Sequence, residues 1–245
     1  MSRPAPAASG VWIVVPAGGR GVRMGRKKQD IKVAARSVLR WTLDVFESTA
    51  EVEGIVVAVP AEDVRAWQRR LRGCRKVRAV VAGGAERQES VARGLAAVPP
   101  TAPWVLIHDG VRPCITPALV RRVIEAAQTH GAAIAALPVT ETLKRGAGGR
   151  VKETVPRDGL WAVQTPQGFR TELLREAHRR ATGDGVAGTD DAALVERLGV
   201  PVHLVPGLPG NVKITRPDDL PLARRLLAPR GRETRSGRRP RRRTR

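Results

Sequence analysis

The chain has 245 residues, with 44 Lys or Arg against 23 Asp or Glu, so its formal net charge is +21. This length allows one large domain with a buried core, and no apolar run is long enough to cross a membrane. Only two cysteines are present, without the spacing of a disulfide framework or a zinc site. Because the N-terminus also has no apolar signal-peptide core, we expect a soluble, cytoplasmic protein.

Short apolar runs rich in Val and Ile alternate with longer segments of helical periodicity. The runs predict buried parallel strands at 11–15, 54–59, 77–81, 104–108 and 132–137. The segments between them carry apolar residues three or four positions apart and predict helices at 37–48, 61–71, 88–98 and 117–129. This alternation indicates an α/β fold with a single, doubly wound, mostly parallel sheet, in which ligands bind beyond the carboxyl ends of the strands.

The pattern changes after residue 137. Residues 138–163 alternate polar and apolar residues around a glycine turn at 146–149, which predicts a β-hairpin with legs at 142–145 and 150–154. A hairpin that interrupts a sheet has little core of its own, so we expect an arm that protrudes and packs on a partner subunit. The chain then returns with predicted helices and a strand, at 172–181, 190–198 and 217–227 for the helices and at 202–205 for the strand.

Charge is unevenly distributed along the chain. Residues 229–245 contain nine Arg and one Glu, a net charge of +8, so residues 1–228 carry +13. This Arg-rich tail lacks apolar periodicity, and we expect it to be disordered and available to polyanions. We therefore divide the chain into an extension at 1–10, a domain at 11–228 and the tail. The chain has no Tyr, two Phe and five Trp, which argues against a single-strand binder that stacks bases on aromatic rings.

A glycine-rich loop, PAGGRGVRMG at 16–25, follows the first predicted strand. Its glycines allow backbone N–H groups to approach phosphates. Met24 stands where a dinucleotide fingerprint has its third glycine, and Lys28 is followed by Gln29 rather than by the Ser or Thr of a P-loop. Arg23 and Lys28 would neutralise charge that builds on a phosphorus centre. The alternative is a tight turn with solvated basic side chains.

Five further motifs follow along the chain. They are GGAERQESV at 83–91, HDGVRP at 108–113, TPQ at 165–167, TDD at 189–191 and NVKIT at 211–215. Together with the glycine loop, they resemble the 2-C-methyl-D-erythritol 4-phosphate cytidylyltransferase family of non-mevalonate isoprenoid synthesis. The resemblance runs from about residue 11 to 227. It implies that a phosphate oxygen of the sugar-alcohol phosphate attacks the α-phosphorus of CTP, with Mg²⁺ bridging the nucleotide phosphates and pyrophosphate leaving.

The resemblance also implies roles for individual residues. The catalytic residues would be Arg23 and Lys28. The nucleotide would be bound by Ala17, Gly18, Gly19, Gly21, Gly84, Arg87, Ser90, Asp109 and Gly110, with Asp109 also next to the metal. The acceptor would be bound by Arg112, Thr142, Arg157, Thr165, Thr189 and Lys213. Because the family's arm crosses to the other subunit, the resemblance implies a homodimer with a shared site.

Several assignments have structural alternatives. His108 and Cys114 fit packed or hydrogen-bonded side chains, and residues 189–191 fit a helix cap. The loop after Met24 is shorter than the family norm, so Lys27 and Lys28 compete for the catalytic position; we choose Lys28 because it precedes Gln29. Ala85 stands where the family often has an acidic residue.

Two alternative functions remain. Ribitol 5-phosphate is a related acceptor that the sequence separates poorly from methylerythritol phosphate. A nucleic-acid-binding protein on a nucleotidyltransferase scaffold would also explain the charge, and its binding should then depend on the tail.

Overall fold

The computed structural model describes residues 10–19, 28–33 and 35–228. Gly21, Arg23 and Lys27 lie outside these ranges, and so does the side chain of Lys28. The Arg-rich tail and nearly all of the N-terminal extension lie outside them as well.

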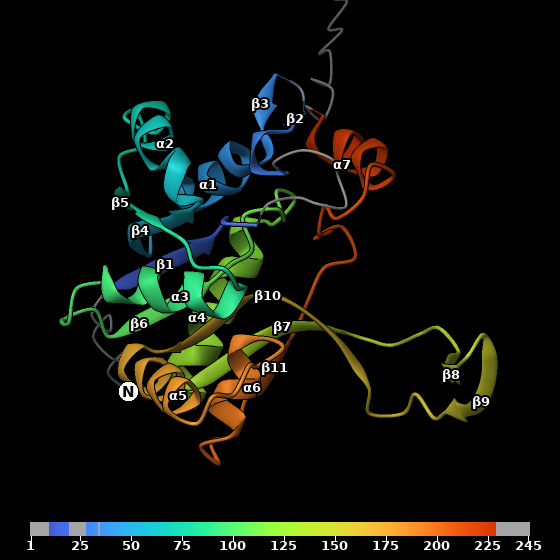
Figure 1. The fold of residues 1–245 in the computed structure, drawn as a ribbon. Helices are drawn as coiled ribbons and strands as arrows, with labels where there is room; N and C mark the ends of the chain where they lie inside the picture. The colour runs from blue at the N-terminus through green and yellow to red at the C-terminus, as the bar shows by residue number, and fades with distance from the viewer. Residues whose placement is uncertain (1–9, 20–27, 34, 229–245) are drawn as a thin grey trace, which may run out of the picture.

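A seven-stranded sheet forms the centre of the described fold, in the order β11-β7-β10-β6-β1-β4-β5 (Figure 1). Six strands are mutually parallel, and β10 runs antiparallel between β6 and β7. The predicted strands are confirmed to within two residues at each end. The observed bounds are β1 Val11–Pro16, β4 Val52–Val59, β5 Val77–Ala82, β6 Trp104–Ile107, β7 Ala132–Pro138, β10 Trp161–Arg170 and β11 His203–Pro206.

Seven α-helices accompany the sheet within the described residues, at α1 Val38–Ser48, α2 Val64–Arg70, α3 Arg87–Ala96, α4 Pro117–His130, α5 Thr171–Gly183, α6 Asp191–Glu196 and α7 Asp219–Leu227. Their ends follow local signals. The Ser37 hydroxyl accepts the N–H of Arg40 at the start of α1, and Pro117 follows the Thr116 cap of α4. The predicted helix at 61–71 is divided into a 3₁₀ turn at Ala61–Asp63 and α2. None of the described helices is long and apolar enough to cross a bilayer.

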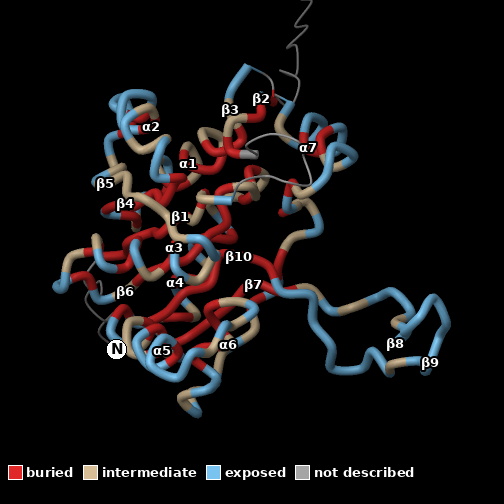
Figure 2. Tube along the Cα trace, viewed as in Figure 1, coloured by how far each residue is buried: buried red, intermediate tan, exposed pale blue. Residues whose placement is uncertain are grey.

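The sheet is buried on both faces (Figure 2). Alternate residues of β1 point to opposite layers, so Ile13 packs with α1 and α4 while Val14 packs with α3 and α5. Two apolar layers therefore explain why the strands are uninterrupted apolar runs rather than alternating ones. A third, smaller cluster joins α7 to the short ladder of β2 (Lys32–Val33) and β3 (Arg36–Ser37).

Strand β10 was missed by the sequence analysis, which placed residues up to 163 in the hairpin. Trp161, Ala162 and Val163 pair with β7 in the main sheet, so they are not part of the arm. The strand contains Pro166, and its register with β7 shifts between Val163 and Gln167. A proline has no N–H for the ladder and is tolerated at such an irregularity. Because Pro166 and its polar neighbours interrupt the apolar pattern, the sequence did not indicate this strand.

The predicted hairpin is confirmed as β8 (Leu143–Ala147) and β9 (Arg150–Val155), joined at Gly148 and Gly149. Both glycines have positive φ, 59° and 73°, as a tight two-residue turn requires. The hairpin projects far from the sheet as an arm (Figure 1). Its surface is exposed almost throughout, including Val151, which is 65% exposed.

Candidate active site

A cavity of about 270 Å³ opens where β1, β5 and β6 end. The chain winds from β1 to β4 and β5 on one side and then returns to β6 on the other side of β1, so the cavity lies at the topological switch point of the sheet. It is lined by Pro16, Ala17, Gly18, Gly19, Gln29, Gly84, Ala85, Glu86, Arg87, Ser90, Asp109, Val111 and Lys213.

Two glycine loops approach each other closely at one wall of this cavity. A Cβ on Gly18 would lie 3.1 Å from the Ser90 hydroxyl, and a Cβ on Gly83 would lie 2.8 Å from it. The same hydroxyl accepts the N–H of Gly84 (3.0 Å) and donates to the carbonyl of Glu86 (3.1 Å). Ser90 therefore holds the second loop in place, and the absence of side chains lets the backbone of both loops line the cavity.

Asp109 lies at the centre of a cluster of cations. Its Oδ1 accepts from Nε of Arg87 at 3.0 Å, and its Oδ2 lies 2.9 Å from Nζ of Lys213 and 3.5 Å from Nε of Arg112. Arg87 also contacts Asp191, at 2.8 Å. These three cations face two carboxylates, which leaves a net positive charge in this part of the cavity.

These contacts fix the charge state of the cluster. Burial by itself would raise the pKa of Asp109, but the charges of Arg87 and Lys213 and the hydrogen bond from Lys213 outweigh it and hold the pKa well below its usual range. Burial would lower the pKa of Arg87, and Asp191 and Asp109 together raise it above its ordinary value. Both groups are therefore ionised at neutral pH.

A hydrogen-bonded layer lies directly beneath Asp109. The N–H of Asp109 donates to the Thr165 hydroxyl (3.1 Å), which lies 3.1 Å from Nδ1 of the fully buried His108. Nε2 of His108 faces the carbonyl of Arg112 at 3.2 Å and must be the donor, because a carbonyl only accepts. Burial lowers the pKa of His108 to about 4, so the ring is neutral. The prediction that His108 is a packed, hydrogen-bonded histidine is confirmed.

Comparison with known proteins gives the family. Residues 11–228 match the family described as IspD, 2-C-methyl-D-erythritol 4-phosphate cytidylyltransferase. The chain belongs to this cytidylyltransferase family.

Among curated relatives, the 2-C-methyl-D-erythritol 4-phosphate cytidylyltransferase of Thermosynechococcus vestitus is 46% identical over 88% of this chain and 94% of the relative. The bifunctional enzyme IspD/IspF of Anaeromyxobacter dehalogenans is 47% identical over 87% of this chain and 56% of its own length. The crystal structure of the cytidylyltransferase from Thermus thermophilus superposes with a TM-score of 0.73 at 42% identity, covering 87% of this chain and 97% of that one.

The structure brings together more than half of the residues predicted from the resemblance to the cytidylyltransferase family. Those that line the cavity are Ala17, Gly18, Gly19, Gly84, Arg87, Ser90, Asp109 and Lys213. Two others lie beneath or behind it. Thr165 is buried under Asp109, and Gly110 is packed so closely that a Cβ would lie 3.1 Å from Leu39. Gly21, Arg23 and the Lys28 side chain lie outside the described part.

The predicted acceptor residues are more scattered. Arg112 borders Asp109 and donates through Nη1 to the carbonyl of Asn211 (2.9 Å). Thr189 is exposed in the loop before α6. Thr142 and Arg157 are exposed on the arm, where Arg157 donates to the carbonyl of Thr140. Neither arm residue lines the cavity of its own chain.

The sequence analysis missed Gln29, Gln167 and His178 as functional candidates, and it considered Asp191 only within residues 189–191, as a ligand or as part of a helix cap. Gln29 is buried, lines the cavity, and its Nε2 has no partner within the described residues. Gln167, His178 and Asp191 form the contacts behind Arg87. Gln29, Gln167 and Asp191 lie in the family's motifs, which was the available signal, whereas nothing in the sequence marks His178.

Proposed function

We propose that this chain transfers CMP from CTP to 2-C-methyl-D-erythritol 4-phosphate, giving 4-diphosphocytidyl-2-C-methyl-D-erythritol and pyrophosphate. The supporting observation is the cavity at the switch point of the sheet, where two glycine loops face the Asp109 cation cluster. Membership in the cytidylyltransferase family supports the same activity.

The reaction needs no nucleophilic side chain. A phosphate oxygen of the acceptor forms a bond to the α-phosphorus of CTP while the bond to the oxygen that bridges toward the β-phosphorus breaks. Negative charge accumulates around the α-phosphorus, and Arg23 and Lys28 neutralise it in our proposal. In this proposal the backbone of the first glycine loop holds the triphosphate, and Gly84, Arg87 and Ser90 bind the nucleoside side of the nucleotide.

Magnesium fits this site as a metal that the nucleotide brings with it. No group of three or more His, Cys, Asp or Glu side chains is arranged to hold an ion within the described ranges. Mg²⁺ commonly needs only one or two carboxylates, with substrate phosphates and water as its other ligands. The donor set at the cavity meets that need through Asp109, whose pKa ensures that it is ionised. When bound, the ion would neutralise part of the triphosphate charge.

The acceptor site is completed by a second copy of the chain in this proposal. Arg112 and Lys213 supply charge beside Asp109 from the same chain, while the arm supplies Thr142 and Arg157 to the partner. Exposed apolar side chains on the arm and at its base give it a surface to pack on, with Val151, Trp161 and Val163 at 65%, 39% and 42% exposure. A cytoplasmic location and contact between the tail and polyanions stay predictions.

Pyrophosphate release tests the proposed reaction. The purified chain should release pyrophosphate only when CTP, Mg²⁺ and 2-C-methyl-D-erythritol 4-phosphate are all present. Ribitol 5-phosphate in place of that acceptor is the matched control, and we expect a much lower kcat/KM. Faster turnover of ribitol 5-phosphate would reassign the acceptor, and no release with either polyol phosphate would contradict cytidylyl transfer.

A further inference from the structure

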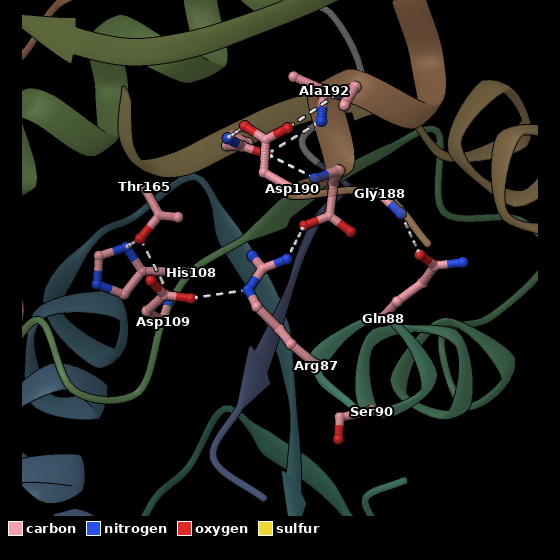
Figure 3. A network of polar contacts seen from close by, with 12 residues as sticks. Arg87, Gln88, Ser90, His108, Asp109, Thr165, Gly188, Asp190 and Ala192 are labelled. Atoms are coloured by element: carbon pink, nitrogen blue, oxygen red, sulfur yellow. Dashed lines mark hydrogen bonds and ion pairs between the residues drawn. The ribbon is translucent and has the colours of Figure 1, made fainter. Parts of the chain in front are cut away.

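A continuous line of polar contacts runs from helix α5 to the candidate active site. Figure 3 shows its inner part, where Arg87 contacts Asp109. Nε2 of His178 lies 3.0 Å from Oδ1 of Asp191, and Oδ2 of Asp191 accepts from Nη1 of Arg87 at 2.8 Å. Arg87 in turn donates through Nε to Asp109 at 3.0 Å. Each carboxylate oxygen of Asp191 therefore has a separate donor, one from α5 and one from the first residue of α3.

The outer members of this line are fully enclosed. His178 is 4% exposed and Asp191 is 1% exposed, and neither lines the cavity. Nδ1 of His178 is buried without a partner in the described part of the chain, so Asp191 is the polar contact of the ring there. Burying a carboxylate and a ring nitrogen costs free energy, and replacing them by apolar side chains would often be neutral or stabilising. A role beyond stability would explain why they are present.

The position of Asp191 is fixed independently by strand β10. Oε1 of Gln167 accepts the N–H groups of Asp191 and Ala192, each at 3.2 Å, and Nε2 of Gln167 donates to Asp190 at 2.7 Å. Asp190 also accepts the N–H of Ala193 and caps α6, as the predicted cap reading allowed. The backbone that carries Asp191 is therefore anchored even without its side-chain contacts.

Arg87 needs such support because it lies at the edge of the cavity. Its side chain is 29% exposed and lines the cavity, while its two carboxylate partners are 8% and 1% exposed. A guanidinium held by one carboxylate can rotate about that contact, whereas two carboxylates at Nε and Nη1 fix its plane. Nη2 takes part in neither of these two contacts, and we assign it to the ligand.

We propose that His178 and Asp191 are positioning residues that hold the Arg87 guanidinium in the orientation that binds CTP. His178 fixes the Asp191 carboxylate, Asp191 fixes Arg87, and Arg87 reaches the nucleotide. This inference rests on the proposed function, because it assigns Arg87 to the nucleotide. Preorganisation of this kind acts on affinity, since the ligand does not have to order the side chain on binding.

The first test measures the affinity for CTP by calorimetry and the KM for CTP by pyrophosphate release. We expect His178→Ala to weaken CTP binding and raise the KM by about five- to tenfold with kcat within about twofold, because uniform binding is lost. His178→Gln, whose amide can donate to Asp191, should recover most of this loss. Leu174→Val, a buried change on the same helix outside the line of polar contacts, is the control for lost stability and should leave the CTP affinity unchanged.

A double-mutant cycle with Arg87→Ala decides whether His178 acts through Arg87. In that background, His178→Ala should cause no further loss of CTP affinity. Three outcomes would overturn the inference. His178→Ala could reduce the CTP affinity equally with and without Arg87, His178→Gln could fail to restore the affinity, or Leu174→Val could reduce it as much as His178→Ala does. If the wild-type chain binds CTP but transfers CMP to no acceptor, the proposed function fails and the cycle still decides the role of His178. If it binds no CTP, both fail.

Discussion

The cavity and the arm are built in opposite ways, although both carry residues assigned to one reaction. At the cavity, Asp109 has three cationic neighbours, the Ser90 hydroxyl makes two hydrogen bonds, and the layer below is completely buried. On the arm, the polar contacts are short-range and exposed, such as the pair Arg145–Glu153 at 2.5 Å. Exposed pairs of this kind contribute little to stability.

The difference between the cavity and the arm indicates which substrate a single chain should be able to bind. The part of the site that we assign to the nucleotide is held by contacts within the chain, so we expect it to bind CTP without a partner. The arm has no such enclosure, and its residues Thr142 and Arg157 are exposed and do not line the cavity of their own chain. Its function in our proposal depends on a second copy, and the following predictions test this division.

The largest effect is expected at the nucleotide side. Lys28→Ala should lower kcat by about 100-fold, roughly 3 kcal/mol, if the ammonium stabilises the transition state as one oxyanion donor does. The KM for CTP should change much less, because the loss is specific to the transition state. Steady-state pyrophosphate release measures both constants.

The matched control is Lys27→Ala, which removes the neighbouring ammonium. We expect a change in kcat of less than about threefold, as for a solvated charge outside the reaction. A loss at Lys27 as large as that expected at Lys28, with Lys28→Ala near wild type, would show that the register chosen from Gln29 is wrong.

The second effect concerns the arm. Arg157→Ala should raise the KM for the polyol phosphate and lower kcat/KM by about 30-fold, the effect of one lost charge-assisted hydrogen bond of about 2 kcal/mol. The affinity for CTP should remain unchanged. Arg150→Ala, an exposed cation on the same hairpin without an assigned role, is the control and should behave as wild type.

Mixing the two impaired variants, assayed with the polyol phosphate well below its KM, tests whether the site is shared. In an equal mixture of Lys28→Ala and Arg157→Ala chains that exchange subunits, half of the dimers are mixed, and each carries one intact site. Activity should rise to about a quarter of wild type for a two-fold dimer. Activity that stays at the average of the two variants would contradict an acceptor site built across subunits.

A smaller effect should appear in the pH dependence of stability. His108 has a pKa of about 4 in the folded chain and about 6.5 when unfolded. The unfolded chain therefore takes up a proton first, so the contribution of His108 is complete above pH 6.5 and is lost as the pH falls toward 4. Between pH 7 and pH 5.5 this amounts to about 1 kcal/mol.

Urea denaturation at both pH values measures this contribution. The glutamine in the His108→Gln variant cannot titrate. Between pH 7 and pH 5.5, the unfolding free energy of the variant should therefore decrease by about 1 kcal/mol less than that of the wild-type chain. An unchanged pH dependence in the variant would show that His108 does not remain neutral when buried.

The smallest effect on activity is expected for the tail. Deleting residues 229–245 removes a net charge of +8 and should leave kcat and the KM values unchanged. Salt-sensitive binding to duplex DNA, measured between about 50 and 200 mM salt, should disappear with the tail. Replacing the nine Arg by Ser is the matched control for length. DNA binding that persists without the tail would implicate the domain itself.

Much of the fold could be predicted because its signals are local. Ser37 and the Thr116–Pro117 pair mark helix starts, and the Val-rich runs mark buried strands. Strand β10 could not be found in this way. Its residues include Pro166 and two glutamines, and it is a strand because both β6 and β7 pair with it across the sheet.

Some residues of the site could also be found from the sequence, and others could not. Gly18 and Asp109 could be placed near the site because both follow strands whose ends meet, whereas their roles came from the resemblance to the cytidylyltransferase family. The contact between Arg87 and Asp191 joins residues 104 positions apart, and His178 belongs to no motif. No periodicity or spacing in the sequence brings these three side chains together.

The sequence by itself determined the class of fold, the hairpin and the set of charged and glycine residues at the strand ends, because propensity and alternation act over a few residues. Only the tertiary structure decided which of them share a cavity, which are buried beneath it and which lie on an arm. Those outcomes depend on the order and direction of strands distant in the chain. The physical reason is that burial and charge pairing are properties of neighbours in space.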